Sequence, residues 1–212
     1  MNIPSARLQR TALVAGLLAG ITAPALAQGT MYTTLGPAFT FQTNNFVQFG
    51  GGAPGAGYAD RFLNPVSASV GSVSLALQAV NPGTTLTVTI RSNSVNGPDG
   101  IVGHFNSVTL PTDPEVVTFT ASSPFQLDAG VRYWVTATGA TGQVDWFRND
   151  QNIDNFTAFG LGGTWTVEQV AGTGLAIDVE AVPEPSTLAL SALGLAGCVA
   201  VVGHGRRGIA EL

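Results

Sequence analysis

The chain has 212 residues, 27 glycines and a formal net charge of −5, and arginine supplies all eight of its strong bases because lysine is absent. This acidic balance repels phosphate backbones and so argues against nucleic-acid binding. The only cysteine, Cys198, lies near the C-terminus. Residues 28–181 therefore hold neither a disulfide nor a cysteine metal site, and no lipid-modified cysteine follows the N-terminal segment.

The N-terminus has the three parts of a secretory signal. Arg7 and Arg10 precede an apolar run at residues 11–21, and Ala25 and Ala27 supply small residues at a cleavage site. We therefore predict a signal helix over residues 1–27, cut by signal peptidase so that Gln28 becomes the first mature residue. The alternative is an amphipathic start helix that is not cleaved.

The middle of the chain shows the period-two alternation of half-buried strands. Apolar residues on one face alternate with Ser72, Ser74, Ala76 and Gln78, or with threonines, on the other. The pattern predicts antiparallel strands with these residues facing a core: Val73, Leu75 and Leu77; Leu86, Val88 and Ile90; Val117 and Phe119; Tyr133, Val135 and Ala137; Leu175, Ile177 and Val179.

Clusters of turn residues separate these strands at intervals of about 8–12 residues. They lie at residues 81–83, 96–100, 111–114, 128–130, 160–163 and 172–174. Because no stretch shows helical periodicity, residues 28–181 are predicted to form one all-β domain. We expect an antiparallel β-sandwich of jelly-roll-like arrangement with about eight to ten strands.

Residues 145–155 concentrate oxygen ligands. Asp145, Asp150 and Asp154 lie there with several asparagines, and calcium prefers about six to eight oxygen ligands from such side chains. A calcium site at these three residues is therefore a hypothesis, and calcium is the only cofactor we consider. The spacing is not that of an EF-hand loop, so an ordinary solvated loop is the alternative.

No motif predicts catalysis. His104 is the only histidine before residue 182, and no Gly-x-Ser-x-Gly sequence accompanies it. Acid pairs for glycoside hydrolysis could be drawn from Asp145, Asp150 or Glu168, but the sequence does not show their separation. Four aromatic residues could form a sugar-stacking platform or could belong to the core: Tyr133, Trp134, Trp146 and Trp165. We therefore predict that the protein is not an enzyme.

The C-terminus combines a rigid polar motif, an apolar run and a basic pair. Val182, Pro183, Glu184 and Pro185 begin it, and the two prolines favour an extended, accessible backbone. An apolar run follows at residues 188–202, and Arg206 and Arg207 end it. We predict a transmembrane helix over residues 188–203 that the arginines hold on the cytoplasmic side. A buried helix of a soluble domain is the alternative.

Residues 182–212 closely resemble the PEP-CTERM sorting signal of Gram-negative bacteria, although five residues follow the arginine pair, where members of the family usually stop. The resemblance implies processing by exosortase near Pro183, an inner-membrane intermediate held by the helix, and delivery to the cell surface or the extracellular space. It also implies a setting of exopolysaccharide production and biofilm formation.

Residues 59–180 are similar to the choice-of-anchor ectodomains found upstream of such tails. Arg61-Phe62, residues 70–80, residues 83–88 and residues 127–135 carry this similarity. We therefore expect an exported structural or adhesive protein in an exopolysaccharide setting. A carbohydrate-binding surface module is the alternative, followed by a secreted hydrolase.

Overall fold

The computed structural model describes residues 29–51, 56–170 and 174–182. Within these ranges the chain forms thirteen strands and one short 3-10 turn, η1 (Pro37–Phe39). The strands are β1 (Gly29–Thr33), β2 (Gln42–Gly50), β3 (Gly57–Leu63), β4 (Ala68–Ala79), β5 (Thr85–Ser94), β6 (Gly97–His104), β7 (Val108–Thr109), β8 (Glu115–Leu127), β9 (Arg132–Thr138), β10 (Gln143–Arg148), β11 (Asn155–Leu161), β12 (Thr164–Val170) and β13 (Ile177–Val182).

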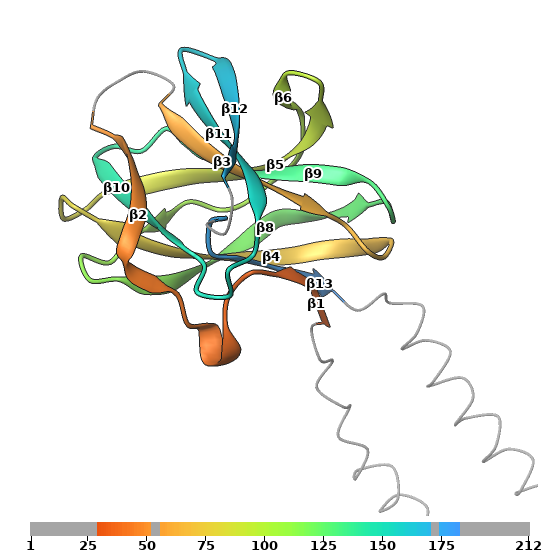
Figure 1. The fold of residues 1–212 in the computed structure, drawn as a ribbon, viewed down its shortest axis with the longest axis horizontal. Helices are drawn as coiled ribbons and strands as arrows, with labels where there is room; N and C mark the ends of the chain where they lie inside the picture. The colour runs from red at the N-terminus through yellow and green to blue at the C-terminus, as the bar shows by residue number, and fades with distance from the viewer. Residues whose placement is uncertain (1–28, 52–55, 171–173, 183–212) are drawn as a thin grey trace, which may run out of the picture.

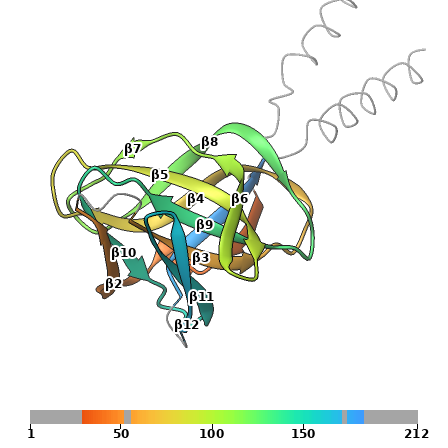
Figure 2. The ribbon, with the colours of Figure 1, turned by 90° about the horizontal axis from the view of Figure 1, so that it is seen from above.

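The strands form two antiparallel sheets that lie in two layers (Figure 1). The six-stranded sheet has the order β1-β13-β4-β10-β2, with β8 along the other edge of β4. The seven-stranded sheet has the order β12-β11-β3-β9-β5-β6, with β7 beside β5. Figure 2 shows β12, β11, β3 and β9 in this order from above. The predicted all-β architecture is confirmed, and the two sheets are consistent with a sandwich.

The core lies between the sheets, and alternation selects its residues. The apolar residues predicted to face the core on β4, β5, β8, β9 and β13 are all buried in one cluster. Trp146 of β10 and Phe62 of β3 add two large, fully buried side chains to this cluster. At about 25 cal/mol per Å² of apolar surface removed from water, this continuous core supplies the main stabilisation of a domain without disulfides.

The other face of the six-stranded sheet is also partly covered, which the alternating pattern did not predict. Ala76 packs with Leu35, Phe147 and Ala176 in a second buried cluster, and Phe41 joins it from the segment before β2. Ser72 and Ser74 are buried as well, and their hydroxyl groups are satisfied by Glu180 and Thr118. The segment between β1 and β2 therefore covers part of the outer face of this sheet.

The two ends of the described domain meet in one sheet. Gly29 of β1 pairs with Ala181 of β13, and β13 in turn pairs with β4 through residues up to Val182. Among the described residues, no helix has the length and apolarity needed to cross a membrane. The predicted signal helix at residues 1–27 and the predicted transmembrane helix at residues 188–203 lie outside the described residues.

Candidate binding site on the outer face of the seven-stranded sheet

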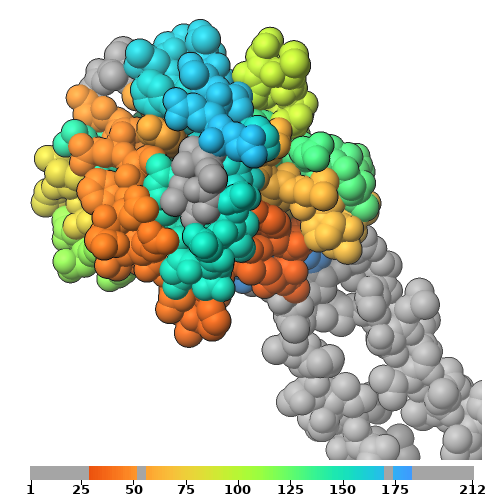
Figure 3. Space-filling model, viewed as in Figure 1, coloured from red at the N-terminus to blue at the C-terminus, as the bar shows by residue number. Residues whose placement is uncertain are grey.

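Two hairpins bend over the outer face of the seven-stranded sheet. The β5–β6 ladder shifts register between Ile90 and Arg91 and again before Asn93, and such bulges increase the local bend and twist. The tip of this hairpin thereby reaches the β11–β12 hairpin, where a Cβ added at Gly97 would lie 2.8 Å from Cγ2 of Val167. Figure 3 shows the two hairpins as neighbouring projections.

Beneath the hairpins lies a small apolar cluster around Trp134. This side chain points away from the main core, yet only 1% of its surface is exposed. It packs with Ala59 and Ala158, and with Phe156 and Trp165 at the margin. Its indole Nε1 donates a hydrogen bond of 2.9 Å to Oδ1 of Asn93. The hairpins therefore bury what would otherwise be an exposed sheet face.

Arginines surround this cluster. Arg61 of β3 and Arg91 of β5 both pair with Trp134, one on each side, and Arg132 lies two residues earlier on β9. Arg91 stabilises the β5–β6 hairpin, because its Nη1 donates a hydrogen bond to the carbonyl oxygen of Asp99 at 2.8 Å. Arg61 and Arg132 instead face a cavity. Three of the four arginines between residues 28 and 182 (61, 91, 132 and 148) thus lie on one sheet face.

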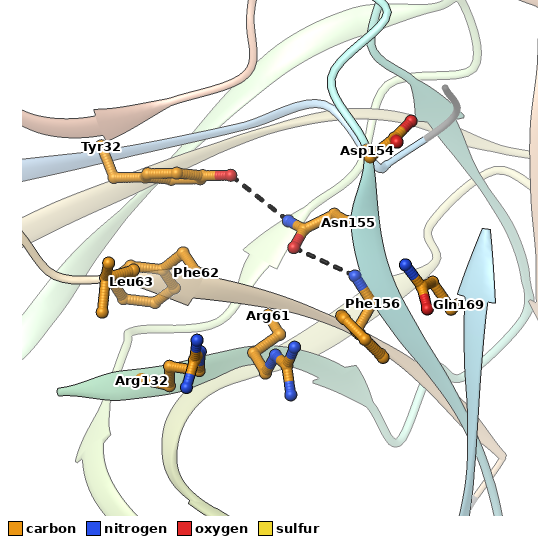
Figure 4. Close-up of a pocket in the computed structure, with 9 residues that line it drawn as sticks. All are labelled: Tyr32, Arg61, Phe62, Leu63, Arg132, Asp154, Asn155, Phe156 and Gln169. Carbon is orange, nitrogen blue, oxygen red and sulfur yellow. Dashed lines mark hydrogen bonds between the residues drawn. The ribbon is translucent and has the colours of Figure 1, made fainter. Parts of the chain in front are cut away.

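The cavity has a volume of about 260 Å³ and opens between β3, β9 and the β11–β12 hairpin. Figure 4 shows Arg61 and Arg132 next to each other on one side of it, with Gln169 and Asp154 also on its lining. Burial lowers the pKa of Arg61 from its ordinary value, the nearby charge of Arg132 lowers it further, and the charge of Asp60 opposes both effects. The cavity is therefore locally cationic in an acidic domain.

A buried polar network forms the back of this cavity. Asp60 is fully buried and accepts hydrogen bonds from the backbone N–H of Leu175 and from Nδ2 of Asn155. The same Asn155 Nδ2 donates to Oη of Tyr32 at 3.3 Å, and its Oδ1 accepts the backbone N–H of Phe156 at 3.0 Å. Burial raises the pKa of Asp60 well above its usual range and outweighs these hydrogen bonds. The network fixes the start of β11 against β3.

The structure does not bring the three predicted calcium ligands together. Asp145 is buried on β10 and accepts a hydrogen bond of 2.8 Å from Nε2 of Gln48, whereas Asp150 is exposed and bonds Gln151. Asp154 lies separately, on the lining of the cavity. Across residues 29–51, 56–170 and 174–182, no three acidic, histidine or cysteine side chains gather as a metal site would require.

The structure also tests two other expectations. Residues 145–148 belong to strand β10 rather than to a loop. Of the two interpretations of the four aromatic residues, the core interpretation holds for three, because Trp134 and Trp146 are 1% and 0% exposed and Tyr133 is 6% exposed. Buried rings cannot stack on a sugar, and of the four only Trp165 is partly accessible.

Most of the predicted sorting residues lie outside the described part of the chain. Val182 ends β13 and pairs with Ser69 of β4. The remaining members of the predicted sorting motif, signal cleavage site and membrane stop lie outside the described residues: Pro183, Glu184 and Pro185; Ala25, Ala27 and Gln28; Arg206 and Arg207.

Comparison with protein families decides what the C-terminal segment is. Residues 181–207 match the PEP-CTERM protein-sorting motif. The chain carries a PEP-CTERM sorting signal. This motif indicates a secreted protein that exosortase processes and that is sorted to the cell surface. The match begins inside β13, at Ala181, so the motif follows the folded domain directly. No curated protein matches the chain.

Proposed function

We propose that the protein is a non-enzymatic structural or adhesive component of the cell surface or of an extracellular polysaccharide matrix. The observation that carries the proposal is the PEP-CTERM motif that continues from the last strand of the sandwich. In this proposal signal peptidase cuts after Ala27, a helix at residues 188–203 holds an inner-membrane intermediate, and exosortase then cuts near Pro183.

The arrangement of the domain supports this role. Gly29 and Ala181 pair in one sheet, so the two proposed processing sites leave the sandwich at the same place. Removal of both signals then leaves the paired strands and the core intact. The similarity of residues 59–180 to choice-of-anchor ectodomains remains a prediction that fits the same role.

The test is the intact mass of the protein, with cell fractionation, in the native host with and without exosortase. The proposal expects cuts near Ala27 and near Pro183, the second only when exosortase is present, and protein at the surface or in the medium. Pro183→Ala combined with Glu184→Ala is expected to block release, while the exposed Pro65→Ala is not. Retention of residues 188–212 in both strains would refute the proposal.

A second candidate role is carbohydrate binding. The observation in its favour is the cationic cavity of Arg61 and Arg132, rather than the aromatic platform. This role does not exclude the first, because an adhesive matrix protein needs a site for the polymer it holds.

A further inference from the structure

We propose that the cavity between Arg61 and Arg132 binds the carboxylate of an acidic sugar residue in an anionic polysaccharide. This inference names a partner for the proposed surface role, and its biological meaning rests on that role. The binding itself can be measured independently of where the protein is sorted.

The charges on the cavity lining favour an anionic ligand. Arg61 and Arg132 lie next to each other on the cavity lining (Figure 4), and the Cζ atom of Arg61 lies over the rings of Trp134 and Phe156. The charge of Arg132 disfavours the charged form of Arg61 while the charge of Asp60 favours it, and an anion between the two guanidinium groups would relieve their repulsion. Holding two of the few cations of the domain close together costs electrostatic free energy, and an anionic ligand would offset this cost.

The guanidinium group of Arg61 is preorganised. The Cζ atom of Arg61 lies 3.7 Å from the centroid of the Phe156 ring, so the guanidinium plane is supported by an aromatic face. The side chain of Phe156 is in turn placed by the hydrogen bond of its backbone N–H to Asn155. A guanidinium held in this way keeps its N–H groups available, and their fork matches the two oxygens of a carboxylate.

The size and chemistry of the cavity suit a sugar. About 260 Å³ lies just below the ~300–1,000 Å³ that accommodates drug-sized ligands, and it suits a single sugar residue. Besides the arginines, the lining includes the amide of Gln169 and the carboxylate of Asp154, which can hydrogen-bond hydroxyl groups, and the apolar side chain of Leu63. Such a mixture suits a ligand with one negative charge and several hydroxyls.

The charge of the whole domain limits how strongly charged the ligand can be. Between residues 28 and 182 the sequence has four arginines against eleven acidic residues, so a densely charged polyanion is repelled. Asp154 also lies on the cavity lining and disfavours a doubly charged phosphate. A polysaccharide with one carboxylate on each acidic residue fits both conditions.

The experiment is calorimetric titration of the purified full chain, in a mild detergent, with a trimer of galacturonate. Its methyl ester is the matched neutral ligand, and acetate tests whether any carboxylate suffices. We expect measurable binding of the trimer that weakens with salt, at least tenfold weaker binding of the ester, and no comparable binding of acetate.

The variants locate the binding. Arg132 is exposed, so Arg132→Gln is expected to keep the melting temperature while weakening trimer binding at least tenfold. Arg132→Lys keeps the positive charge but loses the planar fork of N–H donors, so this variant should bind the trimer with intermediate affinity. The control is Gln126→Glu, an exposed change on β8 that alters the net charge equally, and its affinity should stay within about twofold of the original because salt screens distant surface charges.

Several outcomes would overturn the inference. They are equal affinity for trimer and ester, equal affinity for acetate, no binding of the trimer, or equal losses in Arg132→Gln and Gln126→Glu. Each would leave the sorting experiment with exosortase unaffected. Conversely, a protein that binds the trimer but remains in the membrane in both strains would retain the site and lose the proposed surface role.

Discussion

Arg61 and Phe156 lie on neighbouring strands with the guanidinium stacked on the ring, Cζ being 3.7 Å from the centroid. The stack links β3 to β11 at the mouth of the cavity, on the opposite side of the sheet from the buried Asp60. One contact therefore has two roles, because it stabilises the hairpin and orients a ligand group.

Phe156→Leu separates these roles. The variant keeps an apolar side chain but loses the ring face, so we expect about 1 kcal/mol less folding stability and severalfold weaker galacturonate binding. The matched control is Phe159→Leu on the same strand, whose ring contacts Tyr58 away from the cavity. Chemical denaturation and calorimetry on both variants measure the two effects. Equal affinities would show that the stack does not orient Arg61.

Gly97→Ala tests the contact between the two hairpins. Gly97 has φ of +108°, and an added Cβ would meet Val167 at 2.8 Å. We expect about 2–3 kcal/mol less stability, from backbone strain plus crowding. The control is Gly83→Ala, with φ of +79° and open space around the added atom, which should cost only about 1 kcal/mol of strain. Thermal unfolding compares them, and equal losses would contradict the proposed contact.

Asp60→Ala tests the network behind the cavity. The change removes the acceptor of the backbone N–H of Leu175 and one of the two acceptors of Asn155 Nδ2, which keeps Oη of Tyr32. An unsatisfied buried donor costs about 1–3 kcal/mol, so we expect a loss of about 2–3 kcal/mol. Asp60→Asn retains one acceptor oxygen and should lose less. Urea denaturation ranks the two variants, and the reverse order would contradict this account.

Asp178 predicts a pH dependence of stability. Burial raises its pKa to about 6, with a hydrogen bond from Thr33 opposing and the charge of Glu180 adding to the rise. Because the folded chain holds this proton more tightly than the unfolded chain, the contribution of Asp178 to stability is fully present below a pH of 3.8 and is lost as the pH rises to about 6. The full shift corresponds to about 3 kcal/mol, which we reduce to about 1–2 kcal/mol because the adjacent Thr33 is exposed to solvent.

The measurement is urea denaturation of the original chain and of Asp178→Asn at pH 4, 5, 6 and 7. The difference in unfolding free energy between the two proteins should change over pH 4 to 6 and then level off. A difference that stays constant across this range would show that Asp178 is not the titrating group.

The sequence predicts the fold best where a strand has one covered face. Leu86, Val88 and Ile90 alternate with threonines because one face of β5 lies in the main core, and all three are buried as expected, although Thr89 on the other face is buried as well. The alternating pattern does not predict strand β10, because this strand is covered on both faces. Val144, Asp145, Trp146 and Phe147 are buried in succession, since both faces of β10 are covered and the alternation is lost.

The sequence does not predict the candidate site either, because the residues of the site are distant along the chain. Arg61, Arg91 and Arg132 lie on three strands, and only the order β3-β9-β5 places them together. A faint signal existed in the sequence. Each arginine adjoins a core residue, Phe62, Ile90 or Tyr133, and strand alternation therefore turns all three toward the same outer face.

The position of β13 also has a mechanical consequence. This strand lies between β1 and β4 and ends at Val182, where the sorting motif continues. Its ladder hydrogen bonds run across the strand direction, so a pull on Val182 along the strand loads the bonds on both sides together instead of peeling them one by one. A polymer that pulls on the domain while the chain is attached through this end would therefore load β13 in shear, the direction in which its ladder hydrogen bonds resist force together.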